Sequence, residues 1–256
     1  MHRLIAVLLS DGNVDPRRNS IGFTENKALV KRLVKDFEIV EGIPLIWATV
    51  KHHNSLKART YNKALTNRLF EVCNTFRTRP CHTHPQCSDG KTCKLCIADS
   101  GDKYPIIELD ENIISTPRKK REFLKYFYSC DGGVSISAYR RKDNGKLQSS
   151  LEVKVGSTNP QIKRILSRIL RSLGFSDLIM KQDGISLKTY DSFVKFRDNI
   201  SFLKEASVKR GNFIGRTKNE MLDLAIKCKE LSMEGYWINR LGSVEAVMNY
   251  IHSLLG

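Results

Sequence analysis

Two acidic residues stand at equivalent places in two similar stretches of the sequence. Asp11 ends the apolar run that begins at Leu4, Asp131 ends the run that begins at Phe123, and a glycine follows each acid. The two acids lie 120 positions apart, about the length of one small domain. A repeat at such a distance indicates two related halves within one chain.

Each apolar run predicts a short buried helix that ends at its glycine. A helix C-terminus carries partial negative charge and free carbonyl oxygens, so an acid there is poorly placed for stability but well placed to bind a hard cation. Two such helices, packed side by side and parallel, would bring Asp11 and Asp131 together. We therefore expect a Mg²⁺ site, because this ion prefers carboxylate, carbonyl and water oxygens. For either copy alone, the alternative is an Asp-Gly turn that only ends a core helix.

The two runs resemble the paired helices of single-chain LAGLIDADG homing endonucleases of the archaeal, intron-encoded type. The resemblance covers most of residues 1–205 and rests on the two acid-glycine ends and the strand-like segments after them. It implies an α+β fold of two pseudo-symmetric αββαββα repeats, whose curved antiparallel sheets form a saddle over DNA. It also implies a monomer in which Asp11 and Asp131 bind divalent metal, with backbone carbonyls near Ser10 and Cys130 completing the coordination.

Two features depart from the family pattern. Small residues usually occupy the close-contact positions of the paired helices; Ala6 fits, whereas Tyr126 is bulky where glycine is common. The family also often places a basic residue on the strand end beneath each acid, and the nearest positions here are Glu25 and Ser157. Three lysines are the candidates to take that role: Lys27, Lys154 and Lys188.

The composition indicates a polyanionic partner. The 256 residues carry 43 Lys and Arg against 27 Asp and Glu, a formal net charge of +16. Nucleic acid is the first candidate for such an excess, and an anionic membrane the second. The membrane interpretation is disfavoured because no apolar run approaches the roughly 18–20 residues of a membrane span. The apolar start is too short for a signal peptide, so we expect an intracellular protein, cytoplasmic or at the nucleoid.

The order of predicted elements divides the chain into four parts. Residues 1–76 are the first repeat, 77–105 a cysteine-rich insert or linker, 106–205 the second repeat, and 206–256 a helical C-terminal extension. Apolar spacing predicts helices over 26–37, 62–76, 118–130, 159–173 and 191–203, and strands or hairpins over 21–24, 44–61, 134–155 and 178–189. The extension predicts two helices, 217–232 and 243–255, which either pack on the core or contact DNA as a helix-turn-helix pair.

The polar faces of the strands are the candidate DNA-contacting surface. Along 44–52 we expect Ile46 and Val50 to face the core and Trp47 and Lys51 to face outward. Arg, Lys, Gln and Ser side chains can contact base edges and phosphates, and a two-stranded ribbon fits the major groove. An ordinary solvated sheet face is the alternative. The candidates are Arg17, Arg18, Trp47, Lys51 and Arg59 in the first half, and Ser135, Ser137, Tyr139, Arg140, Arg141, Lys142, Gln148 and Lys154 in the second.

Five of the seven cysteines fall between Cys73 and Cys96. Cys93 and Cys96 have the C-x₂-C spacing of metal ligands, and Cys81 and Cys87 could complete a Cys₄ zinc site with them. One or two disulfides and free thiols are the alternatives, since intracellular proteins of hyperthermophiles can carry disulfides. The sequence leaves these three outcomes open.

Three functions fit these residues. The first is a site-specific endonuclease that hydrolyses one phosphodiester bond in each DNA strand, with divalent metal at Asp11 and Asp131. The second is a cleavage-deficient protein on the same scaffold, either a maturase that binds intron RNA or a DNA-binding regulator, which the departures at Glu25 and Tyr126 favour. The third is a ribonucleoprotein component whose basic surface serves only assembly.

Overall fold

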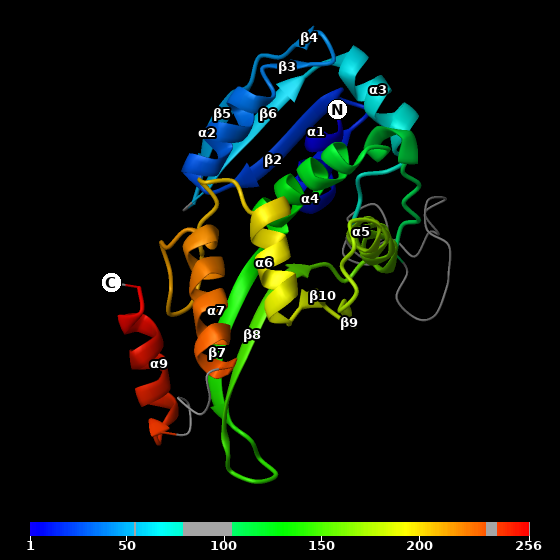
Figure 1. The fold of residues 1–256 in the computed structure, drawn as a ribbon. Helices are drawn as coiled ribbons and strands as arrows, with labels where there is room; N and C mark the ends of the chain where they lie inside the picture. The colour runs from blue at the N-terminus through cyan, green and yellow to red at the C-terminus, as the bar shows by residue number, and fades with distance from the viewer. Residues whose placement is uncertain (54, 79–103, 234–239, 256) are drawn as a thin grey trace, which may run out of the picture.

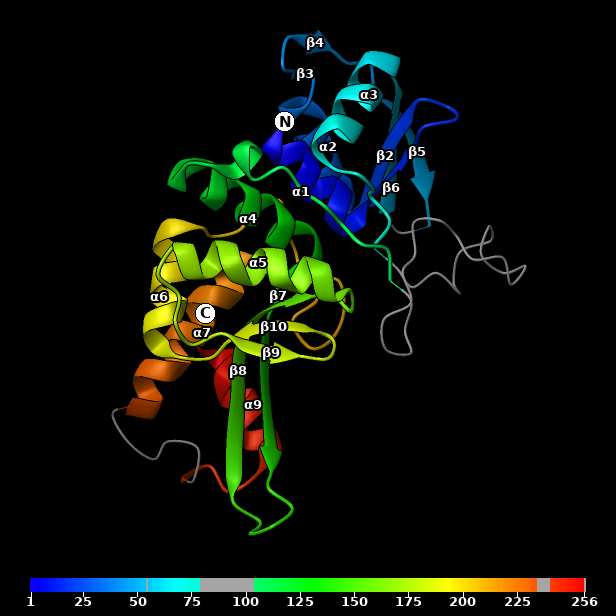
Figure 2. The ribbon, with the colours of Figure 1, turned by 90° about the vertical axis from the view of Figure 1, so that its right-hand side faces the viewer.

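The protein, described by a computed structural model over residues 1–53, 55–78, 104–233 and 240–255, has two halves that meet along a pair of helices (Figure 1, Figure 2). The first half contains α1 (His2–Asp11), β1 (Gly12–Asp15), β2 (Ser20–Glu25), α2 (Lys27–Asp36), β3 (Ile39–Val40), β4 (Ile43–Pro44), β5 (Ala48–His52), β6 (Ser55–Tyr61) and α3 (Lys63–Val72). The second half contains the 3₁₀ turn η2 (Glu111–Ile114), α4 (Pro117–Asp131), β7 (Gly132–Arg140), β8 (Leu147–Gly156), α5 (Pro160–Ser172), β9 (Ile179–Lys181), β10 (Gly184–Leu187) and α6 (Tyr190–Asn199). The C-terminal part adds α7 (Lys218–Met233) and α9 (Val244–Ser253).

Each half forms a four-stranded antiparallel sheet, and the two sheets have matching strand orders, β1-β2-β6-β5 and β7-β8-β10-β9. In both halves the first strand begins directly after the helix that ends in an acid, at Gly12 and at Gly132. The β7–β8 hairpin is long, with continuous pairing from Gly132↔Val155 to Arg140↔Leu147. These features confirm the α+β fold of two repeated units with antiparallel sheets.

The α1 and α4 helices lie side by side and parallel. Residues Leu4 to Leu9 of α1 are all buried, so this ten-residue helix depends on packing rather than on its own propensity. Near the start of both helices, Glu122 of α4 binds His2 and Arg3 of α1, each at 2.7 Å. The opposite ends, which carry Asp11 and Asp131, therefore lie together in the middle of the molecule.

Tyr126 does not obstruct this packing, contrary to the expectation from its size. Its ring turns toward α2 and lies 5.9 Å from the ring of Phe37. Its hydroxyl donates a hydrogen bond to Asp36 Oδ2 at 2.6 Å. The bulky residue thus joins α4 to the first half of the chain.

The C-terminal helices cover the apolar face of the long hairpin. The α7 helix packs on α6, β7 and β8, and α9 packs on β7 (Figure 1). Val247 and Ile251 of α9 are fully buried. The extension therefore packs on the core, which is the first of the two alternatives considered for it. Within the described ranges, none of the helices combines the length and the apolar character that crossing a bilayer requires.

Candidate metal centre and nucleic-acid interface

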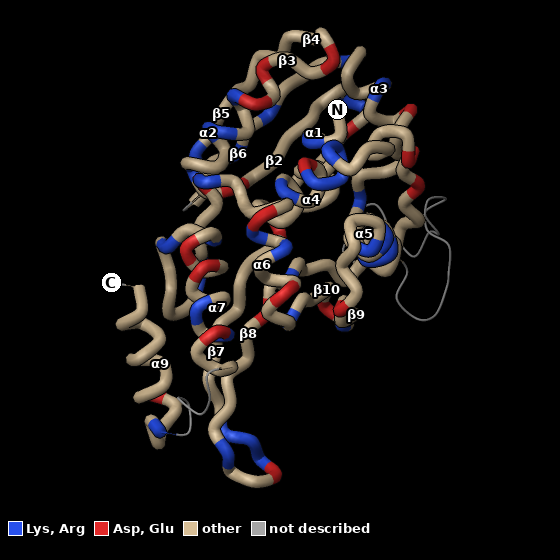
Figure 3. The backbone as a smooth tube through the Cα atoms, viewed as in Figure 1, with Lys and Arg blue, Asp and Glu red and all other residues tan. Residues whose placement is uncertain are grey.

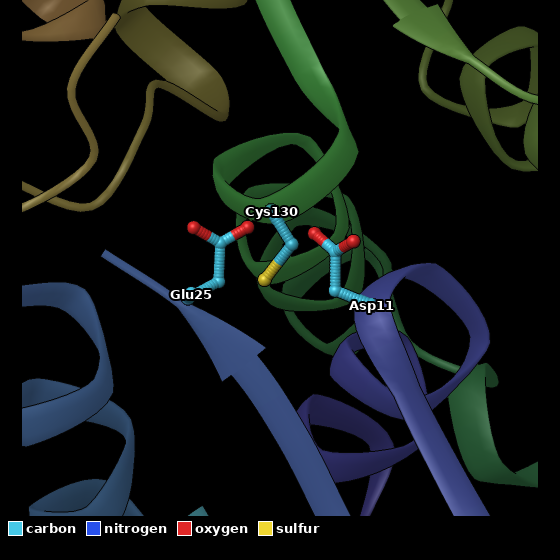
Figure 4. A group of neighbouring side chains, drawn as sticks. All are labelled: Asp11, Glu25 and Cys130. Atoms are coloured by element: carbon cyan, nitrogen blue, oxygen red, sulfur yellow. The ribbon is translucent and has the colours of Figure 1, made fainter. Parts of the chain in front are cut away.

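Side chains from three elements converge where α1 and α4 end. They are Asp11 at the end of α1, Glu25 at the end of β2 and Cys130 in the last turn of α4, and they point toward one another (Figure 4). One ligand atom from each, two carboxylate oxygens and the thiol sulfur, lie within 4.8 Å of one another. Across the described ranges, no other group of three His, Cys, Asp or Glu side chains is close enough to hold a metal ion.

The Asp11 carboxylate is set up to receive a cation. Its Oδ2 is buried and has no hydrogen-bond partner. Burial raises the pKa of Asp11 to about 8, with smaller contributions from a hydrogen bond to Glu25 and from the negative charge of Asp131. Because a cation would replace the proton that this carboxyl otherwise retains, the residues fit a bound divalent metal.

The donor set favours a hard ion. Burial raises the pKa of the Cys130 thiol well above its usual value, so a metal would have to displace a firmly held proton from the sulfur. The remaining donors are the carboxylates of Asp11 and Glu25 and the carbonyl oxygens at the helix ends, which suit Mg²⁺. The Ser10 hydroxyl donates to Val7 O at 2.9 Å, and the Ser10 side chain also interacts with the Cys130 thiol at the edge of the site.

Asp131 is near this cluster but is not part of it. Its charge contributes to the raised pKa of Asp11, so the two acids do lie close, as expected. However, the tight group of ligand atoms contains Glu25 in its place. The sequence pattern therefore predicted the closeness of the two acids but did not identify Glu25, which it marked only as a departure from the family.

A lysine from a distant segment completes the cluster. Lys209 lies between α6 and α7, and its Nζ donates to Glu25 Oε1 at 2.6 Å across 184 residues of sequence. Burial lowers the pKa of Lys209, but attraction to Glu25 and their hydrogen bond outweigh burial and raise it overall. The backbone N–H of Asn26 donates to the other oxygen of Glu25 at 3.0 Å. Of the lysines expected in this role, Lys188 instead binds Glu152 at 2.8 Å.

In the first sheet, the side chains of β5 and of the residues just before it point to the opposite faces from those expected. Trp47 packs inward, 5.1 Å from the ring of Phe23, and its Nε1 donates to Phe37 O at 3.0 Å. Ile46 and Val50, expected in the core, are 91% and 64% exposed. The expected order of faces is wrong by one residue, which turns every side chain to the other side.

The register shows which basic residues share the open face of this sheet. Arg59 pairs with Gly22 and Ala48, and Lys57 pairs with Thr24 and Val50, so both project from the side opposite Phe23 and Ala58. Lys51 pairs with Leu56 on the other face, at an exposed strand end. Lys57, two residues from Arg59 on the same strand, thus lies beside it on this face, in place of Trp47 and Lys51. Arg17 and Arg18 are exposed in the turn between β1 and β2.

In the second sheet, most of the predicted residues do share one face. The pairs Tyr139↔Gln148, Ser137↔Ser150 and Ser135↔Glu152 put them on the side opposite Ile136 and Leu151, together with Lys154. Arg140 lies on the other face, where its guanidinium donates to Gly145 O at 3.0 Å and Gly242 O at 2.5 Å. Arg141 binds Asp143 at 2.5 Å, and Lys142 is exposed in the turn. Lys and Arg also lie at the hairpin tip and along α5 (Figure 3).

The expected zinc ligands Cys81, Cys87, Cys93 and Cys96 lie outside the described residues, so the choice between zinc, disulfides and free thiols stays a prediction. The three described cysteines, Cys73, Cys130 and Cys228, are buried free thiols.

Comparison with known proteins gives a fold and no sequence family. No family model matches this chain, and no curated protein matches it. The structure of the LAGLIDADG meganuclease I-AabMI bound to uncleaved DNA aligns with 98% of this chain and 96% of that chain, with a TM-score of 0.53 and 9% identity. The meganuclease I-SmaMI bound to uncleavable DNA aligns over 100% and 95%, with a TM-score of 0.54 and 10% identity. I-DmoI in complex with DNA and Mn aligns over 78% and 94%, with a TM-score of 0.41 and 14% identity. At these identities the similarity to single-chain LAGLIDADG homing endonucleases is one of fold.

Proposed function

We propose that this chain is a site-specific endonuclease that hydrolyses one phosphodiester bond in each strand of double-stranded DNA and depends on a divalent metal. One observation carries the proposal: the buried, unpartnered oxygen of Asp11 lies beside a second acid where α1 and α4 end together. The net charge of +16 and the open polar faces of both sheets support a DNA partner. The structures of I-AabMI and I-SmaMI, which share the fold, contain bound DNA.

The residues of the cluster would divide the work as follows. When bound, a divalent cation, which we propose is Mg²⁺, would supply a lowered pKa for the attacking water and a positive charge beside the phosphate. Asp11 and Glu25 would hold this cation, and Asp131 would orient the attacking water beside it. Lys209 is 47% exposed on the rim of the cluster, where its ammonium can attract the phosphate of the bond to be cut.

The sheets would bind the duplex. Lys57 and Arg59 in the first sheet and Lys154 in the second would contact phosphates, while Tyr139 and Gln148 would contact base edges. Because one chain supplies both halves of the site, we propose that it acts as a monomer. An enzyme of this kind works where DNA is present, so we propose an intracellular location and a gene within a mobile intron.

The test is cleavage of the intronless allele of the host gene with and without Mg²⁺. Asp11→Asn and Asp131→Asn should each lower the rate by about 10³-fold while leaving DNA binding in a gel-shift assay intact. Asp198→Asn is the control, since this acid is exposed on α6 and pairs with Arg197. If both acid variants cut as fast as the parent, the proposal fails. If the parent never cuts but binds intron RNA tightly, the cleavage-deficient maturase is the better interpretation.

A further inference from the structure

Lys218, the first residue of α7, carries a buried ammonium group with no acidic partner. The residue is 5% exposed, and no carboxylate in the described ranges lies within ion-pair distance of its Nζ. Nζ donates instead to three successive carbonyl oxygens at the end of α4: Ser129 O at 2.6 Å, and Tyr128 O and Cys130 O at 3.3 Å each. A buried charge is costly unless it is satisfied, and the negative end of the α4 helix supplies the three carbonyl acceptors that bind this ammonium.

The end of α1 has no such group. Among the hydrogen bonds of the described residues, no side-chain cation reaches a carbonyl in the last turn of α1, and the side-chain donor found there is Ser10 Oγ, which donates to Val7 O at 2.9 Å. At this end, Oδ2 of Asp11 is buried and has no hydrogen-bond partner. Two helices that occupy equivalent positions therefore end in different surroundings.

One segment, residues 203–218, produces this difference. The backbone N–H of Leu203 donates to Ser129 Oγ at 2.8 Å, and that of Lys218 donates to Ala206 O at 2.8 Å, so the segment is fixed against α4. Its Lys209 neutralises a carboxylate on the α1 side, whereas its Lys218 occupies carbonyl oxygens on the α4 side.

We propose that Lys218 makes the two helix ends unequal as cation sites: one divalent cation binds at the α1 end, on Asp11 and Glu25, and Lys218 prevents a second from binding at the α4 end. A carbonyl lone pair given to an ammonium is not available to a metal. At the α1 end, by contrast, Lys209 takes one oxygen of Glu25 and leaves Asp11 Oδ2 without a partner. This inference rests on the metal centre of the proposed function but not on DNA cleavage. Lys218 acts here as a positioning residue through the carbonyls of α4.

The test measures binding of Tb³⁺, a luminescent probe of oxygen-ligand sites, to the full chain without DNA. The parent should bind about one Tb³⁺, Asp11→Asn should weaken binding by about 10-fold or more, and Asp131→Asn should change it by less than about 3-fold. Lys218→Met keeps the volume of the side chain without its charge and should add a second site. Lys227→Met, an exposed lysine on the same helix, is the matched control and should change nothing.

Each outcome of the Tb³⁺ experiment either supports or overturns part of the inference. Equal losses in the two aspartate variants, or two equal sites in the parent, would overturn the inference and leave the proposed function standing. A folded Lys218→Met protein that still binds one Tb³⁺ would overturn the role of Lys218. If its circular dichroism shows that this variant does not fold, the comparison of the aspartate variants still tests the inequality. A parent that binds no Tb³⁺ would overturn the metal centre itself.

Discussion

The two halves of the chain share a strand order, yet they stabilise their sheets in different ways. The first sheet is stabilised by aromatic packing, in which Trp47 lies against Phe23 and donates to Phe37 O. The second carries a buried acid, Glu152, which accepts from Lys181, Ser186 and Lys188. The two halves therefore share a topology, but different interactions stabilise the two sheets. Substitutions at equivalent positions should have different effects on stability.

The largest effect on the free energy of unfolding is expected in the first sheet, at Trp47. Trp47→Ala should cost about 3 kcal/mol in the free energy of unfolding, because it removes a large packed ring and leaves the carbonyl of Phe37 without its donor. Urea unfolding measures this loss. The control is Lys57→Ala on the open face of the same sheet, which should stay within about 0.5 kcal/mol of the parent. Equal losses in the two variants would show that the faces are not divided as described.

The acid of the second sheet should give a smaller loss that depends on pH. Burial alone would raise the pKa of Glu152, but hydrogen bonds from Lys181, Lys188 and Ser186 outweigh it and lower the pKa to about 2. Because this pKa lies below the unfolded value of 4.5, the ionised acid contributes stability above pH 4.5, and that contribution disappears as the pH falls toward 2. Glu152→Gln should therefore cost about 2 kcal/mol at neutral pH.

The measurement is urea unfolding of parent and Glu152→Gln across the acid range. Their stabilities should converge as the pH approaches about 2. A difference that stays constant from neutral pH down to that point would contradict the assigned interactions.

The hydrogen bond between Tyr126 and Asp36, one of several contacts that join the two halves, should have the smallest effect. Tyr126→Phe removes the hydrogen bond to Asp36 and should cost about 1 kcal/mol, since the ring and its packing remain. The equivalent position in α1 is Ala6, which has no such group. Tyr139→Phe is the matched control, because its hydroxyl bonds Gln148 on an exposed face and should matter little. Identical melting temperatures for the two variants would remove Tyr126 as a link between the halves.

Local patterns were sufficient for the helices. The acid-glycine ends of α1 and α4 and the cap residues Asn26, Asn159 and Ser243 are visible in the sequence, and each cap side chain accepts a hydrogen bond from its helix. The segment that includes β5 shows what such patterns do not predict. Apolar residues stand on both of its faces, so the alternation gives the period but not which side is inside.

The candidate site was predictable only in part for a different reason. Asp11 and Asp131 belong to a repeated motif, which makes them recognisable without a structure. The partnership of Glu25 with Lys209 spans 184 residues and belongs to no repeat. It depends on how the segment after α6 folds back over the boundary between the two halves. Hydrophobic periodicity in the sequence does not predict such a long-range contact.

Because Lys209 and Lys218 lie far along the chain, they are also made late in translation. A ribosome that has made both sheets has not yet made Lys209 or Lys218, and domains generally fold as they emerge, beginning at the N-terminus. The acids at the ends of α1 and α4 are then already together but lack the two ammonium groups. The centre is therefore complete only after the last part of translation, and premature termination beyond α6 would remove both ammonium groups together with the helices that cover the long hairpin.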